Sequence, residues 1–192
     1  MEQLRQKPAL GLFLDMGLGK TIITLSAIAQ LKYGMFCVNK VLVIAPKKVA
    51  EATWQREAEK WDNVSFLRIS TVLGSATKRV KALNTPADIY IINRENVTWL
   101  VDYYKNAWPF DMVVVDEFSS FKNHSAKRFK SLAAIRPHIR RIVGLTGTPS
   151  PNGLEDLWAQ VYLLDSGERL GKYFTHFRSR YFDPGRRSRD GC

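Results

Sequence analysis

LGLFLDMGLGKT, residues 10 to 21, is the stretch of this sequence that decides the fold. Its first residues are apolar and suit a β-strand, its glycines suit a tight turn, and Lys20 and Thr21 open a segment with helical character. Glycines allow consecutive backbone N–H groups to converge on phosphate oxygens, and the positive end of a helix dipole adds to that attraction. The stretch therefore predicts a phosphate-binding loop between a strand and a helix.

Six residues are expected to surround the phosphates: Met16, Gly17, Leu18, Gly19, Lys20 and Thr21. In this geometry the Lys20 ammonium reaches the β- and γ-phosphates, and the Thr21 hydroxyl is a ligand of Mg²⁺. The usual pattern begins with a glycine at the position that Leu14 occupies here, so the match is incomplete. The alternative is a glycine turn that only happens to precede a lysine.

Short runs of β-branched and apolar residues recur along the chain, and each is followed by a polar or amphipathic stretch. They lie at residues 10–15, 41–45, 66–73, 89–93, 112–116 and 141–146. Between them, residues 21–33 and 48–61 are expected to be helical, and a further helix is expected from Asn152 to about Leu164. Alternating strands and helices predict an α/β fold with a mostly parallel sheet covered by helices on both faces. Ligands of such folds bind at the carboxyl ends of the strands.

Two carboxylates, Asp116 and Glu117, stand at the end of one of these buried runs. Unpaired carboxylates are costly at such a place, so a function is expected for both. Coordination of Mg²⁺ by Asp116 and activation of an attacking water by Glu117 account for the pair. The alternative is an acidic pair that caps the following turn.

A third polar element, Thr146-Gly147-Thr148, also follows an apolar run. Two hydroxyls around a glycine suit a polar switch beside a γ-phosphate, although the same residues also suit a simple turn into a helix.

The net charge of the chain indicates what class of partner it binds. The 192 residues contain 29 Lys+Arg against 18 Asp+Glu, a net charge of +11, which favours a polyanionic partner. Seven of the basic residues lie between Phe118 and Leu154, where there is no acidic residue. This stretch either forms a face that binds the polyanion or is an ordinary solvated surface. The first residues do not resemble a signal peptide and no apolar run has the length of a membrane span, so an intracellular, cytoplasmic protein without membrane contact is expected.

Taken together, the motifs resemble those of the first RecA-like lobe of superfamily-two helicases, specifically the Swi/Snf-type double-stranded DNA translocases of phage and bacterial type. Four stretches carry the resemblance: residues 15–21; 41–46 with residues 54–57 and Trp61; 114–117 with Lys122 and Asn123; and 145–149 with Asn152, Leu154, Glu155, Leu157 and Trp158. Core or interface packing is the expected role of both Trp54 and Trp61, which share a helix face.

The resemblance implies a helicase-type ATP hydrolase that uses ATP and Mg²⁺, with Lys20, Asp116 and Glu117 in catalysis and Thr21 and Asp116 on the metal. It also implies that Thr146, Gly147 and Thr148 couple nucleotide state to movement. Contacts to duplex DNA are implied near Pro46, Lys47 and Lys48 and after Thr71. Such contacts are to the backbone and independent of base sequence.

The resemblance has departures. Where the family has a small residue and then a histidine after the two carboxylates, this chain has Phe118 and Ser119. We expect residues 1–184 to form one ATP-binding lobe and residues 185–192 to be a frayed tail, without a second RecA-like lobe. Because that lobe brings arginines to the γ-phosphate in the family, the chain alone is expected to be weakly active or inactive. The alternatives are a catalytically silent nucleotide- or DNA-binding module, and a P-loop kinase or small NTPase.

Overall fold

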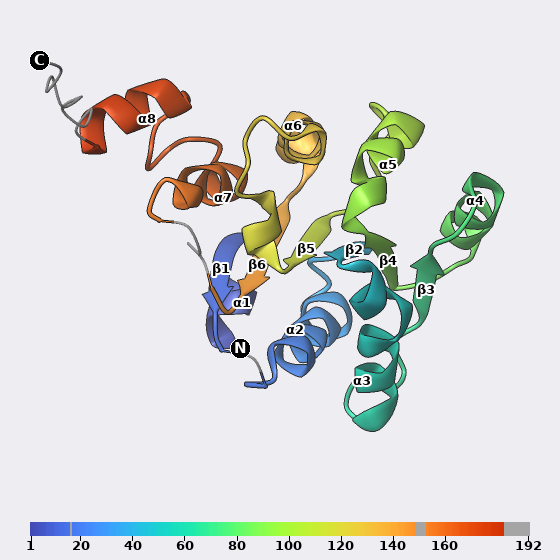
Figure 1. Ribbon diagram of the computed structural model, residues 1–192. Helices are drawn as coiled ribbons and strands as arrows, with labels where there is room; N and C mark the ends of the chain where they lie inside the picture. Colours follow the sequence, from blue (N-terminus) through green and yellow to red (C-terminus); the bar gives the residue numbers. More distant parts are fainter. Residues whose placement is uncertain (16, 149–152, 183–192) are drawn as a thin grey trace, which may run out of the picture.

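The computed structural model describes residues 1–15, 17–148 and 153–182. Within these residues, a six-stranded sheet has the order β1-β6-β5-β2-β4-β3, and every neighbouring pair is parallel (Figure 1). The strands are β1 (Ala9–Phe13), β2 (Val41–Ala45), β3 (Ile69–Val72), β4 (Ile89–Asn93), β5 (Met112–Asp116) and β6 (Arg141–Thr146). The predicted α/β class and parallel sheet are confirmed.

Helices connect the strands. The α-helices are α1 (Glu2–Gln6), α2 (Lys20–Ala29), α3 (Trp54–Lys60), α4 (Ala76–Asn84), α5 (Val97–Tyr104), α6 (Lys127–Ile135), α7 (Asp156–Asp165) and α8 (Phe174–Tyr181). Short π-helical or 3₁₀ turns extend several of them: η1 (Gln30–Gly34), η2 (Val49–Thr53), η3 (Arg94–Asn96), η4 (Phe118–Phe121) and η5 (Arg136–His138). The two helices expected at 21–33 and 48–61 are thus present, each as an α-helix joined to a π-helical turn.

The sheet is covered on both faces (Figure 1). Alternate residues of each strand point to opposite faces, so Val43 belongs to the core cluster that includes residues of α2 and α3, whereas Leu42 belongs to the cluster that includes residues of α5, α6 and α7. Two adjacent interior strands, β2 and β4, are buried along their whole length. Continuous burial explains why these runs are apolar at nearly every position.

Core packing is confirmed for Trp54, which is fully buried, but not for Trp61, which is 42% exposed where α3 has ended one residue earlier and the chain is extended. One local expectation was wrong. Helix α7 begins at Asp156 and not near Asn152; Gly153 has a φ of 121°, which interrupts a right-handed helix. Glu155 is consequently the residue before the helix, and its carboxylate pairs with Arg178 at 3.1 Å. Asn152 itself and the tail at 185–192 lie outside the described residues.

In the part of the chain that the structure describes, no helix combines the length and apolarity needed to cross a bilayer.

Candidate nucleotide site

The expected phosphate-binding loop joins β1 to α2. Helix α2 begins at Lys20, and Gly19 precedes it with a φ of 70°. Gly17 has a φ of 85°, and a Cβ placed on it would meet no atom within 4 Å. Both glycines therefore adopt the left-handed backbone that such a loop requires, and Gly17 faces open space, whereas a Cβ on Gly19 would lie 3.3 Å from Ile22. Met16 lies outside the described residues, and Leu18 is exposed.

Lys20 turns back over this loop. Its ammonium donates hydrogen bonds to the backbone carbonyls of Leu14 at 2.7 Å and Asp15 at 2.9 Å. A cation that binds neutral carbonyls gains less than one that binds an anion, so a phosphate group would compete well for this ammonium. Thr21 lies half-buried in the first turn of α2, next to Lys20.

Asp116 ends β5, and both of its carboxylate oxygens accept hydrogen bonds. Oδ1 accepts from the Glu117 backbone N–H at 3.0 Å, and Oδ2 accepts from the Trp54 indole N–H at 3.1 Å. Burial raises the pKa of Asp116 above its ordinary value, while the hydrogen bond from Trp54 and the charge of Lys20 oppose that rise. A carboxylate desolvated in this way gains from a bound cation, so the residue suits a metal ligand.

Trp54 is a residue of this site that sequence reasoning assigned only to packing. It follows β2, the neighbour of β5, and its ring has no exposed surface. A buried indole N–H needs an acceptor, and the carboxylate at the end of the adjacent strand supplies one. The need of a buried indole N–H for an acceptor was the one feature from which this contact could have been predicted.

Glu117 leaves β5 in the left-handed region, with φ 51° and ψ 57°. Its carboxylate Oε2 accepts a hydrogen bond from the Arg94 guanidinium NH1 at 3.1 Å. Arg94 follows β4 and also donates from Nε to Glu95 at 3.1 Å. Sequence reasoning missed Arg94, since nothing in the local pattern around it distinguishes it from a surface arginine.

Thr146 ends β6, between the strands that carry the other two elements. The Thr146 carbonyl accepts from the Leu14 N–H at 3.2 Å, and its hydroxyl accepts from the Thr148 N–H at 3.2 Å. Pairing of Phe13 with Thr146, and of Asp116 with Leu145, sets the register of β6 between β1 and β5. The loop, the carboxylates and the threonine element are thereby brought to one edge of the sheet. Gly147 is half-buried and Thr148 is exposed.

Phe118, which follows the two carboxylates, is fully buried against β6. A Cβ placed on Gly144 would lie 2.2 Å from the Phe118 ring, so the ring fits only because residue 144 is a glycine. Gly144 stands two residues before Thr146 in the same strand. The carboxylate and threonine elements are therefore connected through an apolar contact.

Pro46, Lys47 and Lys48 follow β2, on the same edge of the sheet as the two carboxylates. Both lysine side chains are exposed, and Lys47 lies 3.9 Å from Glu51. This placement leaves the segment accessible to a large anionic ligand.

The basic stretch between Phe118 and Leu154 does not form a single surface. Arg136 donates to the carbonyls of Leu163 and Leu164 at 2.7 Å each, at the end of α7. Arg141 donates to the Arg5 carbonyl at 3.0 Å, at the end of α1. Both arginines thus satisfy the free carbonyls of helix ends, a structural role.

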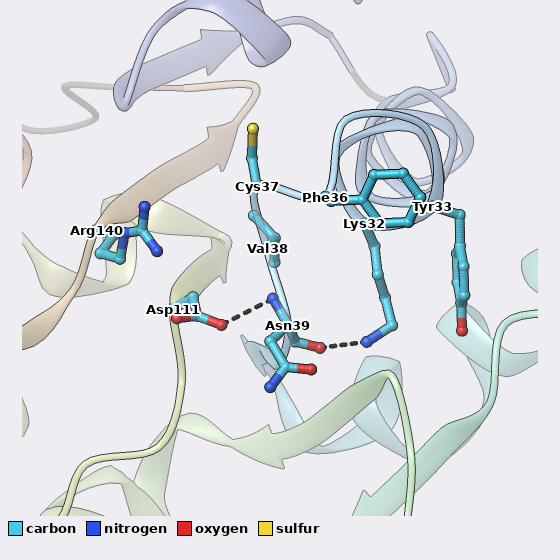
Figure 2. A pocket seen from close by; sticks show the side chains of 8 residues that line it. All are labelled: Lys32, Tyr33, Phe36, Cys37, Val38, Asn39, Asp111 and Arg140. Carbon is cyan, nitrogen blue, oxygen red and sulfur yellow. Dashed lines mark hydrogen bonds between the residues drawn. The ribbon is translucent and has the colours of Figure 1, made fainter.

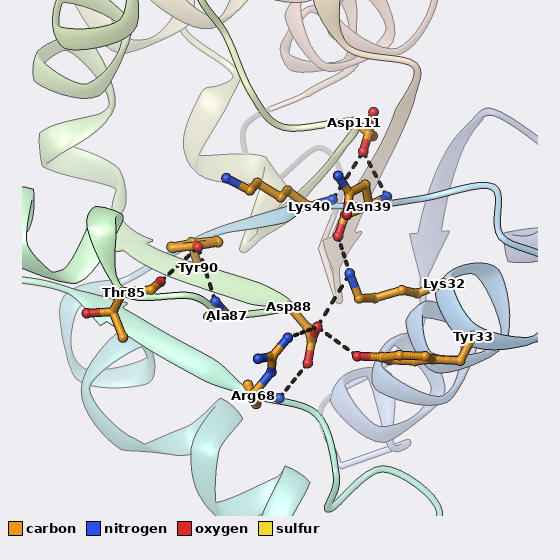
Figure 3. Close-up of polar contacts among 10 residues, drawn as sticks. All are labelled: Lys32, Tyr33, Asn39, Lys40, Arg68, Thr85, Ala87, Asp88, Tyr90 and Asp111. Carbon is orange, nitrogen blue, oxygen red and sulfur yellow. Dashed lines mark hydrogen bonds and ion pairs between the residues drawn. The ribbon is translucent and has the colours of Figure 1, made fainter.

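The opposite edge of the sheet, where the strands begin, holds a different set of polar groups. Asp88 is buried and accepts from the Arg68 backbone N–H and the Tyr33 hydroxyl, both at 2.8 Å, and Lys32 lies 3.4 Å from it (Figure 3). Burial alone would raise the pKa of Asp88, but these hydrogen bonds and the nearby charge hold it below the ordinary value.

A hollow of about 400 Å³ lies at the same edge, between Asp111, Arg140 and the residues of η1, Lys32 and Tyr33 (Figure 2). Asp111 accepts from the backbone N–H groups of Asn39 and Lys40 and so fixes the start of β2. This edge is remote from the phosphate-binding loop, and its contacts anchor the strands.

A parallel sheet with a glycine loop after its first strand, two carboxylates after a central strand and a threonine element between them defines a RecA-like P-loop NTPase lobe. The family comparison agrees: residues 1–185 match the SNF2-related domain. The chain belongs to this family of helicase-type ATPases.

The relatives are longer proteins. A putative protein p41 from Acyrthosiphon pisum secondary endosymbiont phage 1 is 42% identical over 87% of this chain, which spans 38% of that protein. Helicase ssl-1 of Caenorhabditis elegans is 32% identical over 85% of this chain, which spans 7% of that protein. The Sulfolobus solfataricus SWI2/SNF2 ATPase core, solved in complex with dsDNA, superposes with a TM-score of 0.74 and 26% identity, covering 93% of this chain and 35% of that one.

Proposed function

We propose that this chain is the ATP-binding lobe of a translocase whose ATP hydrolysis depends on double-stranded DNA. The observation that carries the proposal is the convergence of the loop, the carboxylates and Thr146 at one edge of the sheet, fixed by the β1–β6 and β6–β5 registers. Family membership supports the hydrolase class, and a relative of similar fold has been solved with dsDNA.

In this proposal the loop residues Gly17, Leu18, Gly19 and Lys20, with Met16, bind the phosphates of ATP. The open space at Gly17 and the left-handed glycines fit a phosphate group, because they allow backbone N–H groups to turn inward. Lys20 would exchange its two carbonyl partners for phosphate oxygens.

Mg²⁺ would be held by the Thr21 hydroxyl and the Asp116 carboxylate. The donor set is a hard one, of oxygens only, and the desolvated Asp116 supplies the negative charge that Mg²⁺ prefers. When bound, the ion would neutralise charge on the phosphates. Glu117 would orient and deprotonate the attacking water, and Thr146, Gly147 and Thr148 would transmit the state of the nucleotide.

Duplex DNA would contact Pro46, Lys47 and Lys48 through its phosphates, which makes binding dependent on salt and insensitive to base sequence. The lobe would comprise residues 1–184, with 185–192 as a tail, and a second RecA-like lobe would provide the arginines that complete the catalytic cleft.

The proposal is tested by measuring ATP turnover by the protein that the gene encodes. We expect hydrolysis that requires Mg²⁺, rises with duplex DNA at low salt and is abolished by Lys20→Ala. Turnover that ignores DNA at low salt would refute the translocase assignment. DNA binding without any turnover, unaffected by Lys20→Ala, would instead favour a catalytically silent binding module.

A further inference from the structure

The Glu117 carboxylate is held from outside its own strand by Arg94. The guanidinium NH1 lies 3.1 Å from Glu117 Oε2, and Nε lies 3.1 Å from Glu95 Oε1. The two ends of this contact differ in how firmly they are fixed. Glu95 is bound through its other oxygen by Asn93, which is buried, at 2.9 Å. The Glu117 and Glu95 side chains are similarly exposed, at 59% and 53%, so the bond from Asn93 is what holds Glu95 more firmly and leaves the bond between Arg94 and Glu117 as the one that exchanges more easily.

The direction of this contact follows from the strand order. The phosphate-binding loop follows β1, which is separated from β5 by β6. Arg94 follows β4, on the opposite side of β5 and beyond β2. The bond to Arg94 therefore draws the Glu117 carboxylate across the end of β2, away from the strand that carries the loop. The neighbouring Asp116, in contrast, is fixed in place by Trp54.

Arg94 also stands on the basic side of this edge. The exposed Lys47 and Lys48 follow the adjacent strand β2, and Lys78 and Arg79 follow β3. A guanidinium presents a planar fork that matches phosphate oxygens at least as well as a carboxylate. A phosphodiester held by the neighbouring lysines would thus compete with Glu117 for the NH1 end of Arg94, while Glu95 retains the Nε end.

We propose that Arg94 is a positioning residue that holds Glu117 in a resting position, and that a phosphate of the DNA backbone releases Glu117 by taking over this guanidinium. The inference rests on the proposed function and adds to it the means by which DNA stimulates hydrolysis. The β4 edge and the catalytic carboxylate are then connected by a single exchangeable ion pair.

The test compares Arg94→Gln with the wild type in the encoded protein, with ATP turnover measured without DNA and at saturating duplex DNA. Loss of a partly exposed ion pair changes an equilibrium by about two- to fivefold. We therefore expect turnover without DNA to rise by about two- to fivefold, stimulation by DNA to fall by the same factor, and the KM for ATP to stay unchanged. Arg94→Lys keeps the charge but loses the planar fork of the guanidinium, so its ATP turnover without DNA should rise less than that of Arg94→Gln.

Arg140→Gln is the matched control, because it removes the same charge at the opposite edge of the sheet and should leave both rates unchanged. If the wild type shows no stimulation by DNA, the proposed function itself fails. If the wild type is stimulated but Arg94→Gln lowers both rates together, or leaves the DNA-free rate at the wild-type value, only this inference is overturned. Should Arg94→Gln fail to fold, as judged by thermal melting, an unchanged DNA-free rate in Arg94→Lys is the overturning result.

Discussion

Trp54→Phe isolates the hydrogen bond that fixes Asp116. The variant keeps an aromatic ring in a fully buried position and removes the indole N–H that lies 3.1 Å from Asp116 Oδ2. A hydrogen bond to a charged group contributes about 1.5–3 kcal/mol, and loss of a group that orients a metal ligand typically lowers metal affinity by about 10- to 100-fold. We expect the Mg²⁺ concentration for half-maximal ATP turnover to rise within that range.

The pH dependence should change as well. The bond from Trp54 opposes the rise that burial causes in the pKa of Asp116, so its removal raises that pKa further. Protons compete with Mg²⁺ for the carboxylate, and the acid limb of the pH–rate profile should therefore move to higher pH. Turnover should be lost at a pH where the wild type is still active.

Trp158→Phe serves as the control for the smaller ring. Trp158 is also buried and also donates its indole N–H, to the Gly171 carbonyl at 3.2 Å, but it lies in α7. Both variants should lose about 1–3 kcal/mol of unfolding free energy from the reduced packing. A folded Trp54→Phe protein whose Mg²⁺ requirement and acid limb match those of Trp158→Phe would refute the reasoning.

Three further predictions concern the same edge of the sheet. Because burial raises the pKa of Asp116, the folded protein holds that proton more tightly than the unfolded chain, and stability is lost as pH rises through the raised pKa. Asp116→Asn should remove this loss, giving a higher melting temperature than the wild type at neutral pH and no such gain in acid; equal melting curves at neutral pH would contradict it. Gly144→Ala should lower the unfolding free energy by about 1–3 kcal/mol through the clash with Phe118, measured by urea denaturation, whereas an unchanged midpoint would show that the ring moves freely. Lys47→Gln combined with Lys48→Gln should reduce the slope of log affinity for duplex DNA against log salt by about 0.9 for each DNA phosphate that is no longer neutralised, and an unaltered slope would exclude both residues from the interface.

The fold could be predicted from the sequence because its signals are local. Runs such as residues 41–45 and 112–115 are buried on both sides and are apolar throughout, and the glycines of the loop mark the turn after β1. The strand order could not be predicted in the same way. It depends on long-range packing that no single stretch of sequence encodes.

The placement of the candidate site residues at one edge of the sheet could be predicted only where a motif carries them. Lys20, Asp116 and Thr146 each follow or end a strand, and a parallel sheet brings such positions to one edge. Trp54 and Arg94 act across strands, through a side chain that reaches the neighbour of its own strand or beyond. Their roles depend on the order β5-β2-β4, which the sequence does not reveal. The density of basic residues between Phe118 and Leu154 did not identify a single binding surface, because Arg136 and Arg141 bind helix-end carbonyls.

The contact between Phe118 and Gly144 constrains how this part of the molecule can vary among its relatives. A side chain at residue 144 collides with the ring at residue 118, whereas a smaller residue at 118 leaves a cavity that a side chain at 144 can fill. Substitutions at the two positions are therefore tolerated in one order: residue 118 must become smaller before residue 144 becomes larger. Where the large ring is present, we expect residue 144 to be a glycine.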